Sequence, residues 1–393
     1  MDRDGGRRNP SLPAPILALT DDLLQEILLR LPPHPFHLAS ASCVRKDWHR
    51  LINDDDFLAR VWRHHRTPAV VGFFGNHPDR SFVTPNAVGG RERFATQIPP
   101  GRWWAYGCRH GRVFLHQRAR GELLVSDPIT RQNHYLFTPP AYMPWCDSLG
   151  TVLCADDHEH GDCHDRPLLV AFLFVNRVRS AMFACVYSSE TEEWGDVSSV
   201  SSSFAYIDMD AKHTVLVGNT IYWPASIFSI LKYDLDTHTL DMVAETPYNV
   251  SIRSEDAIVI LPADDGGLGI VGIEGFHLMF WSRKPNNDGA LVWTVYRSID
   301  LKRFLKPRHL MRLTQYYITP ETIAIAEDAQ MIFISLGYNV YSLHLRSMKF
   351  KKIFRREHFS RMTHPYSTFY TPGVNPGAGD GPAEDLDGAI NLI

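Results

Sequence analysis

The sequence predicts an α+β chain in two parts, a small helical module followed by an all-β propeller of about six to seven blades. From Thr20 to about Arg66, apolar residues recur at helical spacing. From about Pro68 to Pro372, the chain consists of short β-type runs separated by turn residues. We therefore predict four regions: a flexible tail over 1–15, the helical module over 16–67, the β domain over 68–371 and a second flexible tail over 372–393.

Composition and charge describe an ordinary ordered protein. Of the 393 residues, 44% are hydrophobic and 21% are charged, which is typical of folded globular chains. A net charge of -4 creates no strong overall field, so nucleic acid is an unlikely partner and no anionic membrane is required. Six cysteines without a C-x-x-C pair indicate a reduced protein of the cytoplasm and/or nucleus. No cofactor is expected.

The longest uncharged run, Thr214 to Leu231, is the only stretch long enough to raise the question of a membrane span. Gly218 and Pro224 interrupt it, as strand and turn residues would. We predict buried β structure here and a soluble protein.

The first helix has clear start and stop signals. Thr20 can accept a hydrogen bond from a free helix N–H, and two aspartates follow at the positive end of the helix dipole. Pro32-Pro33 ends the helix. Between these signals lies a broad apolar stripe of Leu23, Leu24, Ile27, Leu28 and Leu31.

Two or three further short helices are predicted before Arg66, near Pro35 to Val44, around Trp48 and from Asp54 to Trp62. This module holds more large apolar side chains than a core of about fifty residues needs. Some of them should face a partner protein. The alternative, that all of them build the core of a helical subdomain, stays open on the pattern alone.

The run from Leu19 to Arg66 resembles the F-box family almost from end to end. The helix motif with its Leu31-Pro32 end, the Val44-x-Lys46-x-Trp48 segment and the acidic start before Phe57 occur in the family's order and spacing. Two departures are visible. Thr20 replaces the usual opening proline, and the basic residue common after Leu38 is missing.

The resemblance implies a substrate-recognition subunit without catalytic residues. F-box modules bind a Skp-type adaptor, which attaches them to a cullin-RING ubiquitin ligase, so an unknown protein substrate would bind the β domain. Carried over to this sequence, the adaptor interface and inner core comprise Leu19, Leu24, Ile27, Leu28, Leu31, Pro32, Leu38, Val44 and Trp48.

The β region repeats a loose motif about every 46 to 61 residues. An apolar strand is followed by Asp or Ser, then often Thr, and then by an aromatic residue or leucine, which predicts a hairpin whose turn is capped by the Asp or Ser side chain. Dividing about 305 residues by this period gives six or seven blades, with five to eight possible and a distorted β-sandwich pair as the alternative. The copies begin at Val125, Val186, Lys232, Phe280 and Val340.

The stretch from Tyr106 to Pro140 is similar to the opening blades of plant F-box-associated propeller domains, which are related in shape to kelch repeats. Asp127-Pro128-Ile129-Thr130 matches their turn, and Gly111-Arg112-Val113 approximates their strand.

Other motifs receive the simpler interpretation. The loop from Asp156 to Asp165 is rich in His, Asp and Cys, but it lacks the spaced pairs of zinc sites, so we predict an exposed polar loop and no metal. The basic, aromatic segment from Arg346 to Arg361 is predicted to be an outer strand rather than a nucleic-acid contact. A propeller lectin, a nucleic-acid binder and a propeller enzyme remain the alternative functions.

Overall fold

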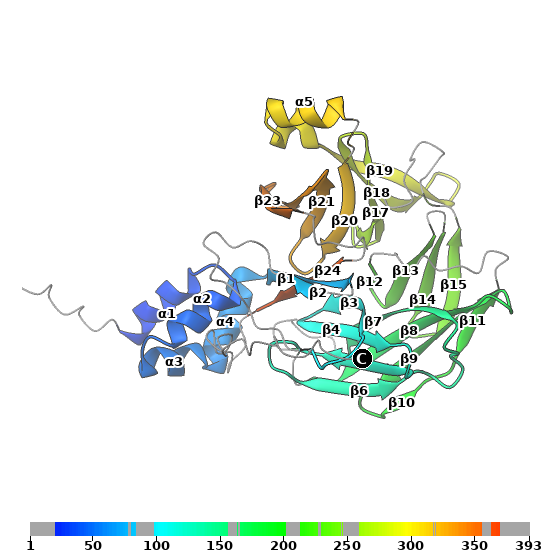
Figure 1. Ribbon diagram of the computed structural model, residues 1–393, viewed down its shortest axis with the longest axis horizontal. Coiled ribbons are helices and arrows are strands. Elements are labelled where there is room, and N and C mark those ends of the chain that lie inside the picture. Colours follow the sequence, from blue (N-terminus) through cyan, green and yellow to red (C-terminus); the bar gives the residue numbers. More distant parts are fainter. Residues whose placement is uncertain are drawn as a thin grey trace, which may run out of the picture.

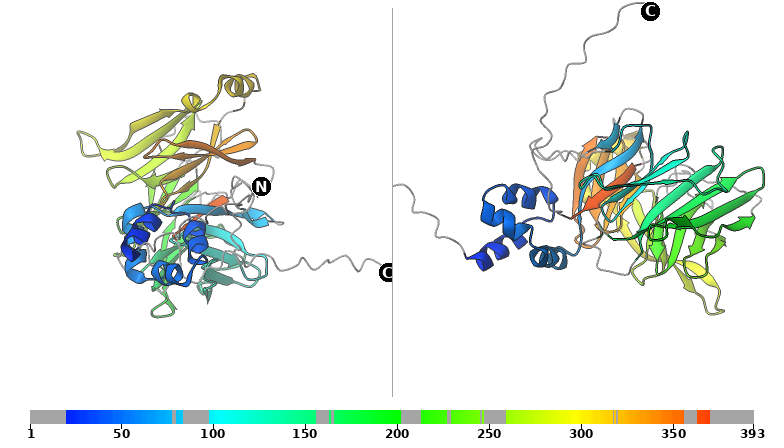
Figure 2. Two further views of the ribbon diagram at one scale, coloured as in Figure 1. Left: turned by 90° about the vertical axis from the view of Figure 1, so that its left-hand side faces the viewer. Right: turned by 90° about the horizontal axis from the view of Figure 1, so that it is seen from below.

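The computed structural model describes residues 20–77, 80–83, 98–155, 163, 166–201, 213–226, 229–244, 246, 259–316, 318, 320–355 and 363–369 (Figure 1). The first four helices gather at one end of the molecule and the strands form sheets at the other. The right-hand view of Figure 2, seen from below, also shows that these helices lie beside the sheets. Residues of both predicted tails, 1–15 and 372–393, lie outside the described ranges.

The helical module consists of α1 (Asp21–Leu29), α2 (Pro35–Ser42), α3 (Lys46–Ile52) and α4 (Asp55–His65). As predicted, the Thr20 hydroxyl caps α1 by accepting a hydrogen bond from the Leu23 N–H at 3.4 Å. The Asp54 carboxylate caps α4 in the same way, accepting from the Phe57 N–H at 3.1 Å. These caps satisfy free donors at the helix starts and fix where each helix begins.

The module has a hydrophobic core of its own, which includes Leu24, Leu28, Leu38, Ile52 and Phe57. No member of this core belongs to any core of the β domain among the described residues. The two parts are therefore separate packing units. The last helix ends at His65 and the first strand begins at Ala69.

Five sheets of the β domain are antiparallel meanders of four or five strands. The first contains β3 (Trp104–Arg109), β4 (Arg112–Gln117), β5 (Glu122–Ser126) and β6 (Asn133–Phe137). The second contains β7 (Asp147–Cys154), β8 (Leu168–Asn176), β9 (Ala181–Ser188) and β10 (Glu193–Trp194), with β11 (Ser198–Ser201) also paired to β9. The third contains β12 (Val215–Val217), β13 (Thr220–Ser226), β14 (Ser229–Asp234) and β15 (Thr239–Ala244).

The fourth sheet contains β16 (Val259–Pro262), β17 (Leu268–Glu274), β18 (His277–Pro285) and β19 (Leu291–Asp300). The fifth contains β20 (Pro320–Ala326), β21 (Met331–Leu336), β22 (Asn339–His344) and β23 (Phe350–Arg355). Between them lie a short 3-10 helix, η1 (Leu301–Phe304), and α5 (Pro307–Gln315), which the sequence pattern did not predict.

The sixth sheet joins the two ends of the β domain. It has the order β2-β1-β24, with β1 (Ala69–His77), β2 (Arg80–Val83) and β24 (Thr363–Thr368). Phe73 of β1 pairs with Val83 on one side and Pro365 on the other. The first strands of the β domain therefore pair with its last strand, β24.

Hydrophobic cores link the sheets into a closed ring. Phe74 and Tyr366 of the closing sheet pack with Leu124 of the first blade. On the other side, Phe73 packs with Phe333 of the fifth blade, with ring centroids 4.8 Å apart. Further cores connect the first three blades, the third with the fourth, and the fourth with the fifth. The β domain is therefore a propeller, and closure removes exposed sheet edges at its seam.

The repeated motif begins on the third strand of each full blade, at the end of that strand in the first three blades and within it in the fourth and fifth. The Asp127 carboxylate accepts hydrogen bonds from the Ile129 N–H at 2.9 Å and the Thr130 N–H at 3.1 Å. Asp234 accepts from the Thr237 N–H in the third blade, so the predicted turn caps are confirmed in these two blades. Ser282 and Ser342 of the fourth and fifth copies lie within β18 and β22 instead of at a turn, which corrects the prediction there. Motif copies and full blades thus correspond one to one.

The structure corrects the predicted number of six to seven blades. The structure has five blades of four or five strands, and the three-stranded closing sheet carries no copy of the motif. Dividing the domain length by the repeat period overcounts, because the period includes connections of very different length. Counting the five motif copies gives the right number of full blades.

The uncharged run from Thr214 to Leu231 forms parts of β12, β13 and β14, as predicted. Its side chains Ile221 and Trp223 are fully buried between blades. Among the described helices, none is both long and apolar enough to cross a membrane.

Candidate functional site

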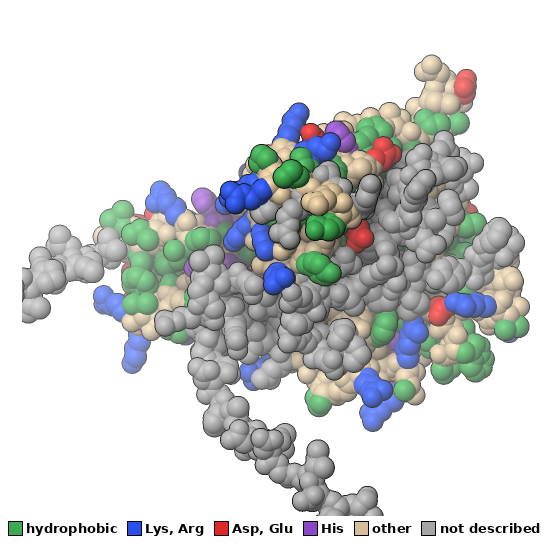
Figure 3. Space-filling view, turned by 45° about the horizontal axis from the view of Figure 1, so that its top comes forward, with side chains coloured by type: hydrophobic (Ala, Val, Ile, Leu, Met, Phe, Trp, Pro, Cys, Tyr) green, Lys and Arg blue, Asp and Glu red, His purple; other side chains and the backbone are tan. Residues whose placement is uncertain are grey.

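Large apolar side chains are exposed on the helical module. Leu23 and Ile27 lie one turn apart on α1 and are 55% and 47% exposed. Val44, which follows α2, is 60% exposed. Figure 3 shows hydrophobic side chains gathered over the module at the left of the view. A separate core already exists beneath them, so these side chains contribute little to the module's own folding.

The residues that the family resemblance implies for the adaptor interface and inner core differ in their exposure. Leu24, Leu28 and Leu38 are buried in the module's core. Leu31 and Trp48 are partly buried and pack against that core, whereas Ile27, Pro32 and Val44 are exposed. Leu19 lies outside the described residues.

Leu23 belongs to the apolar stripe of α1 but not to the interface set that the family resemblance implies. A helical projection alone could have found it, because Leu23 and Ile27 are four residues apart and share one side of α1.

Ion pairs surround the exposed apolar side chains of α1. Arg60 of α4 reaches Glu26 at 3.0 Å and also donates to Gln25, which ties α4 to α1. Glu26 lies 3.5 Å from Arg30 on the same helix. Such exposed pairs contribute little stability, so their main effect is to fix polar groups around the apolar side chains.

The propeller carries a group of charged side chains where several blades meet. The Arg109 guanidinium lies 3.0 Å from the Glu327 carboxylate, and both side chains are largely buried. The His213 ring lies 2.7 Å from the other oxygen of Glu327. Arg109 ends β3 and Glu327 follows β20, so this ion pair bridges the first and fifth blades near the seam.

A cleft of about 410 Å³ lies between the first and second blades. Arg112, His134 and Glu192 are among the residues that line it. Arg112 is buried and donates to the backbone carbonyls of Cys163 and Arg166. Burial lowers the pKa of His134 and opposes its protonation. The cleft is thus polar and mixed in charge.

The basic segment near the C-terminus forms β23, the outer strand of the fifth blade over residues 350–355. Lys351 and Lys352 are exposed, which fits the prediction of an outer strand with solvated lysines. Phe350 stacks on Tyr341 with ring centroids 4.9 Å apart, and Phe354 is buried. These two aromatic side chains therefore serve the core. Residues 356–361 lie outside the described ranges.

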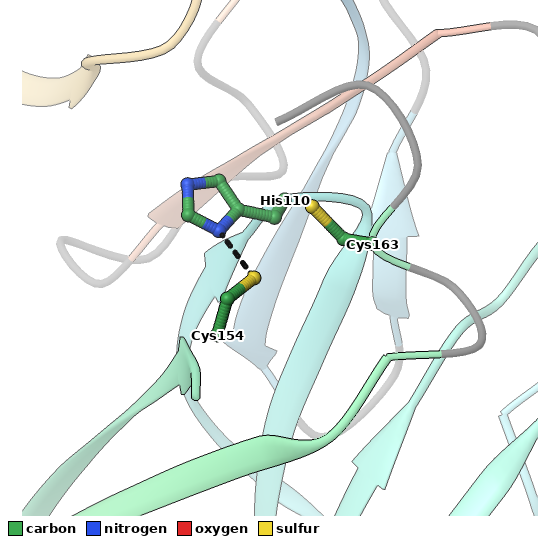
Figure 4. A group of neighbouring side chains, drawn as sticks. All are labelled: His110, Cys154 and Cys163. Carbon is green, nitrogen blue, oxygen red and sulfur yellow. Dashed lines mark hydrogen bonds between the residues drawn. The ribbon is translucent and has the colours of Figure 1, made fainter. Parts of the chain in front are cut away.

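Three side chains with metal-ligand chemistry meet between the first two blades: His110, Cys154 and Cys163 (Figure 4). Their ligand atoms all lie within 4.8 Å of one another, and His110 Nδ1 is 3.3 Å from Cys154 Sγ. Cys163 belongs to the loop that was predicted to be exposed, yet its side chain is buried, which corrects that prediction at this position. The loop's other residues from Asp156 to Asp165 lie outside the described ranges.

Sequence spacing could not reveal this cluster. His110 is 44 residues from Cys154 in the chain, and only the packing of two neighbouring blades brings them together.

Comparisons with solved structures give matches of low sequence identity. A structural genomics protein of unknown function from Bacteroides thetaiotaomicron is 11% identical with a TM-score of 0.38, covering 73% of this chain and 63% of that one. The PQQ-bound aldose sugar dehydrogenase from Streptomyces coelicolor is 13% identical with a TM-score of 0.37, covering 74% and 93%. BamB from Moraxella catarrhalis is 9% identical with a TM-score of 0.29, covering 65% and 58%.

TM-scores this low support no inference about function. This chain also spans less than two thirds of the Bacteroides and Moraxella proteins. No curated protein matches the sequence.

The family comparison is more specific. Residues 104–373 match the family described as "F-box protein AT5G49610-like, beta-propeller". The match begins at the first residue of β3 and extends past the end of β24, so it covers all five full blades and the last strand of the closing sheet. The chain belongs to the AT5G49610-like β-propeller family of F-box proteins.

Proposed function

We propose that this chain is the substrate-recognition subunit of a Skp-cullin-F-box type ubiquitin ligase. In this proposal the helical module is the F-box and binds a Skp-type adaptor, and the propeller binds a protein substrate. The chain itself is a non-catalytic receptor that works in the cytoplasm, the nucleus or both.

The exposed apolar side chains of the helical module are the observation that carries the proposal. Leu23, Ile27 and Val44 are about half exposed or more, although the module has a complete core without them. Burying such side chains against a partner is favourable by about 25 cal/mol per Å² of apolar surface. A helical adaptor surface would provide that burial, and the family match makes a Skp-type adaptor the natural partner.

The separation of the cores supports a division of labour. Because the helical core shares no residue with the propeller cores, adaptor binding need not perturb the propeller. The cleft lined by Arg112 and His134 and the charged group around Glu327 offer polar surfaces for recognising a substrate. Both lie on the propeller, apart from the adaptor surface.

A double variant and a matched control, both expressed in cells, test the proposal. Leu31→Ala with Pro32→Ala alters the end of α1, where one side chain is partly buried and the other is exposed. Removing an apolar anchor from an interface typically costs about 2 kcal/mol or more, so adaptor capture should fall by roughly thirtyfold. Proteins captured by the propeller should be retained, lose their ubiquitination and accumulate, as measured by mass spectrometry with and without proteasome inhibition.

The matched control is Leu291→Ala with Val292→Ala, two exposed apolar residues of β19. This control should capture the adaptor as the unmodified chain does. If the Leu31/Pro32 variant lost the adaptor but kept full ubiquitination of its captured proteins, the receptor proposal would be wrong.

A further inference from the structure

We propose that His110, Cys154 and Cys163 bind a soft divalent transition-metal ion, with Zn²⁺ as the natural occupant. The site would fasten the first blade of the propeller to the second. This inference does not rest on the ligase function, and it revises the sequence-based expectation that the chain binds no metal.

The distances fit a tetrahedral ion. Zn²⁺ sits about 2.3 Å from a cysteine sulfur and about 2.0–2.1 Å from a histidine nitrogen. Tetrahedral angles then place neighbouring ligand atoms roughly 3.5–3.8 Å apart. The observed ligand atoms lie 3.3 Å apart for His110 Nδ1 and Cys154 Sγ, and at most 4.8 Å apart overall. Side-chain shifts of a fraction of an ångström to about one ångström would complete the geometry.

The second nitrogen of His110 faces a carboxylate. Asp328 Oδ1 lies 3.8 Å from His110 Nε2, and the other carboxylate oxygen accepts from the His110 backbone N–H at 3.4 Å. Metal-binding histidines usually direct their remaining ring nitrogen to a carboxylate or carbonyl, which fixes the tautomer and the ring orientation. Asp328 is placed to hold Nδ1 of His110 as the ligand atom.

The backbone positions of the three ligands are also well fixed. His110 occupies the turn between β3 and β4 with φ 50, beside Gly111 with φ 75. Cys154 is the last residue of β7. The Arg112 guanidinium donates to the carbonyl oxygen of Cys163 and anchors that residue against the first blade.

The charges balance when an ion binds. Cys163 is 3% exposed and Cys154 is partly buried, so both sulfur atoms lie largely away from solvent. Two thiols lose their protons to solvent as one divalent cation enters, so the ion, the two thiolates and a neutral imidazole together carry no net charge. Three protein ligands leave one tetrahedral position for water. Histidine with thiolates favours zinc over the hard cations Mg²⁺ and Ca²⁺.

Titration of the full-length, reduced and chelator-treated chain with Co²⁺, followed by displacement with Zn²⁺, tests the site. One Co²⁺ per chain should bind with the intense thiolate-to-cobalt absorption that reports sulfur ligation. Zn²⁺ should abolish this absorption and raise the melting temperature of the propeller, because an ion that binds only the folded state stabilises it. Cys154→Ser and Cys163→Ser should each lose the absorption.

Two further variants test whether misfolding could explain a loss of Co²⁺ binding. Asp328→Asn leaves all three ligands in place and should weaken the affinity for Co²⁺ by about 10- to 100-fold while keeping the sulfur absorption. Cys185→Ala removes a buried thiol of β9 outside the cluster and should bind one Co²⁺ as the unmodified chain does.

Three outcomes would overturn the proposal. The first is the absence of sulfur-ligated Co²⁺ in a folded chain. The second is binding that is equal in the Cys154→Ser, Cys163→Ser and unmodified chains. The third is a Cys154–Cys163 disulfide that persists under the reducing conditions of the titration.

Discussion

The helical module and the propeller use apolar side chains in different ways. Strand β8 is buried on both faces along most of its length, because its sheet lies between two neighbouring blades. Helix α1 buries Leu24 and Leu28 on one side but exposes Leu23 and Ile27 on another. The propeller closes its ring of sheets but leaves apolar side chains such as Phe137 and Trp145 exposed, whereas α1 carries two exposed apolar side chains one turn apart, which a partner can cover together. Exposed apolar side chains on α1, outside the core of the module, therefore favour this helix as the place for a partner to bind.

The largest effect is expected from a truncation that removes the last strand of the propeller, because this strand closes the ring. Deletion of residues 363–393 removes β24, including Tyr366, which is fully buried and donates to the Gly111 carbonyl at 2.9 Å. The edge of β1 would then be exposed, and β3 and β20 would lose the strand that lies against them. We expect loss of cooperative unfolding of the whole propeller, measured by calorimetry, while the helical module stays folded.

Deletion of residues 376–393 alone is the control and should leave the melting temperature unchanged. A propeller that tolerated both deletions equally would not depend on closure.

Substitutions at two neighbouring residues of α1, Leu28 and Ile27, should differ in their effect on stability, because one side chain lies in the core and the other on the surface. Leu28 is 2% exposed, so Leu28→Ala should destabilise the helical module by about 2–5 kcal/mol through lost burial and a cavity. Ile27 is 47% exposed, and Ile27→Ala should change stability by no more than about 0.5 kcal/mol. Denaturant unfolding of the module measures both effects. Equal destabilisation by the two variants would place Ile27 in the core and remove the basis for a partner surface.

Buried histidines should make the stability of the propeller sensitive to acid. The exposed residues of the helical module should not have this effect. Burial, with a smaller effect of Arg118, lowers the pKa of His116 from 6.5 to about 3. The His116 contribution to stability is therefore fully present above pH 6.5 and is lost as the pH falls from 6.5 toward 3. The Tyr106 hydroxyl, 2.7 Å from His116 Nδ1, also lies 2.7 Å from Ser148 Oγ, so it keeps a partner when His116 is replaced.

Comparison of the unmodified chain with His116→Phe isolates this effect. Between pH 7 and pH 5 the unmodified propeller should lose about 2 kcal/mol more unfolding free energy than the variant, since each proton taken up on unfolding contributes about 1.4 kcal/mol per pH unit. Denaturant titrations at the two pH values measure the difference. An identical pH dependence would mean that the pKa of His116 is the same in the folded and unfolded states.

Local signals in the sequence predicted much of the fold. The Thr20 and Asp54 caps, the prolines after α1 and the Asp127 turn are short-range features, and each occurs in the structure as expected. The pairing of β1 with β24 was also predictable, because a propeller needs its terminal strands to meet. Helix α5 was missed because it interrupts a region whose pattern is otherwise that of strands.

Features that depend on distant contacts could not be predicted in the same way. The buried state of Cys163 and its approach to His110 follow from how two blades pack, not from spacing along the chain. The ion pair of Arg109 with Glu327 joins residues 218 positions apart. For the adaptor surface, the apolar stripe was visible in the sequence, but only burial in the structure separates Ile27 from Leu28.

Direct titration of a purified Skp-type adaptor into the full chain tests the central claim, that the exposed side of the helical module is a docking surface. Ile27→Asp puts a charge on that surface without touching the core, and it should weaken binding by at least about thirtyfold with an unchanged melting temperature. Val178→Asp, at a residue 90% exposed between β8 and β9, should bind as the unmodified chain does. Adaptor binding by Ile27→Asp that equals that of Val178→Asp would contradict the claim.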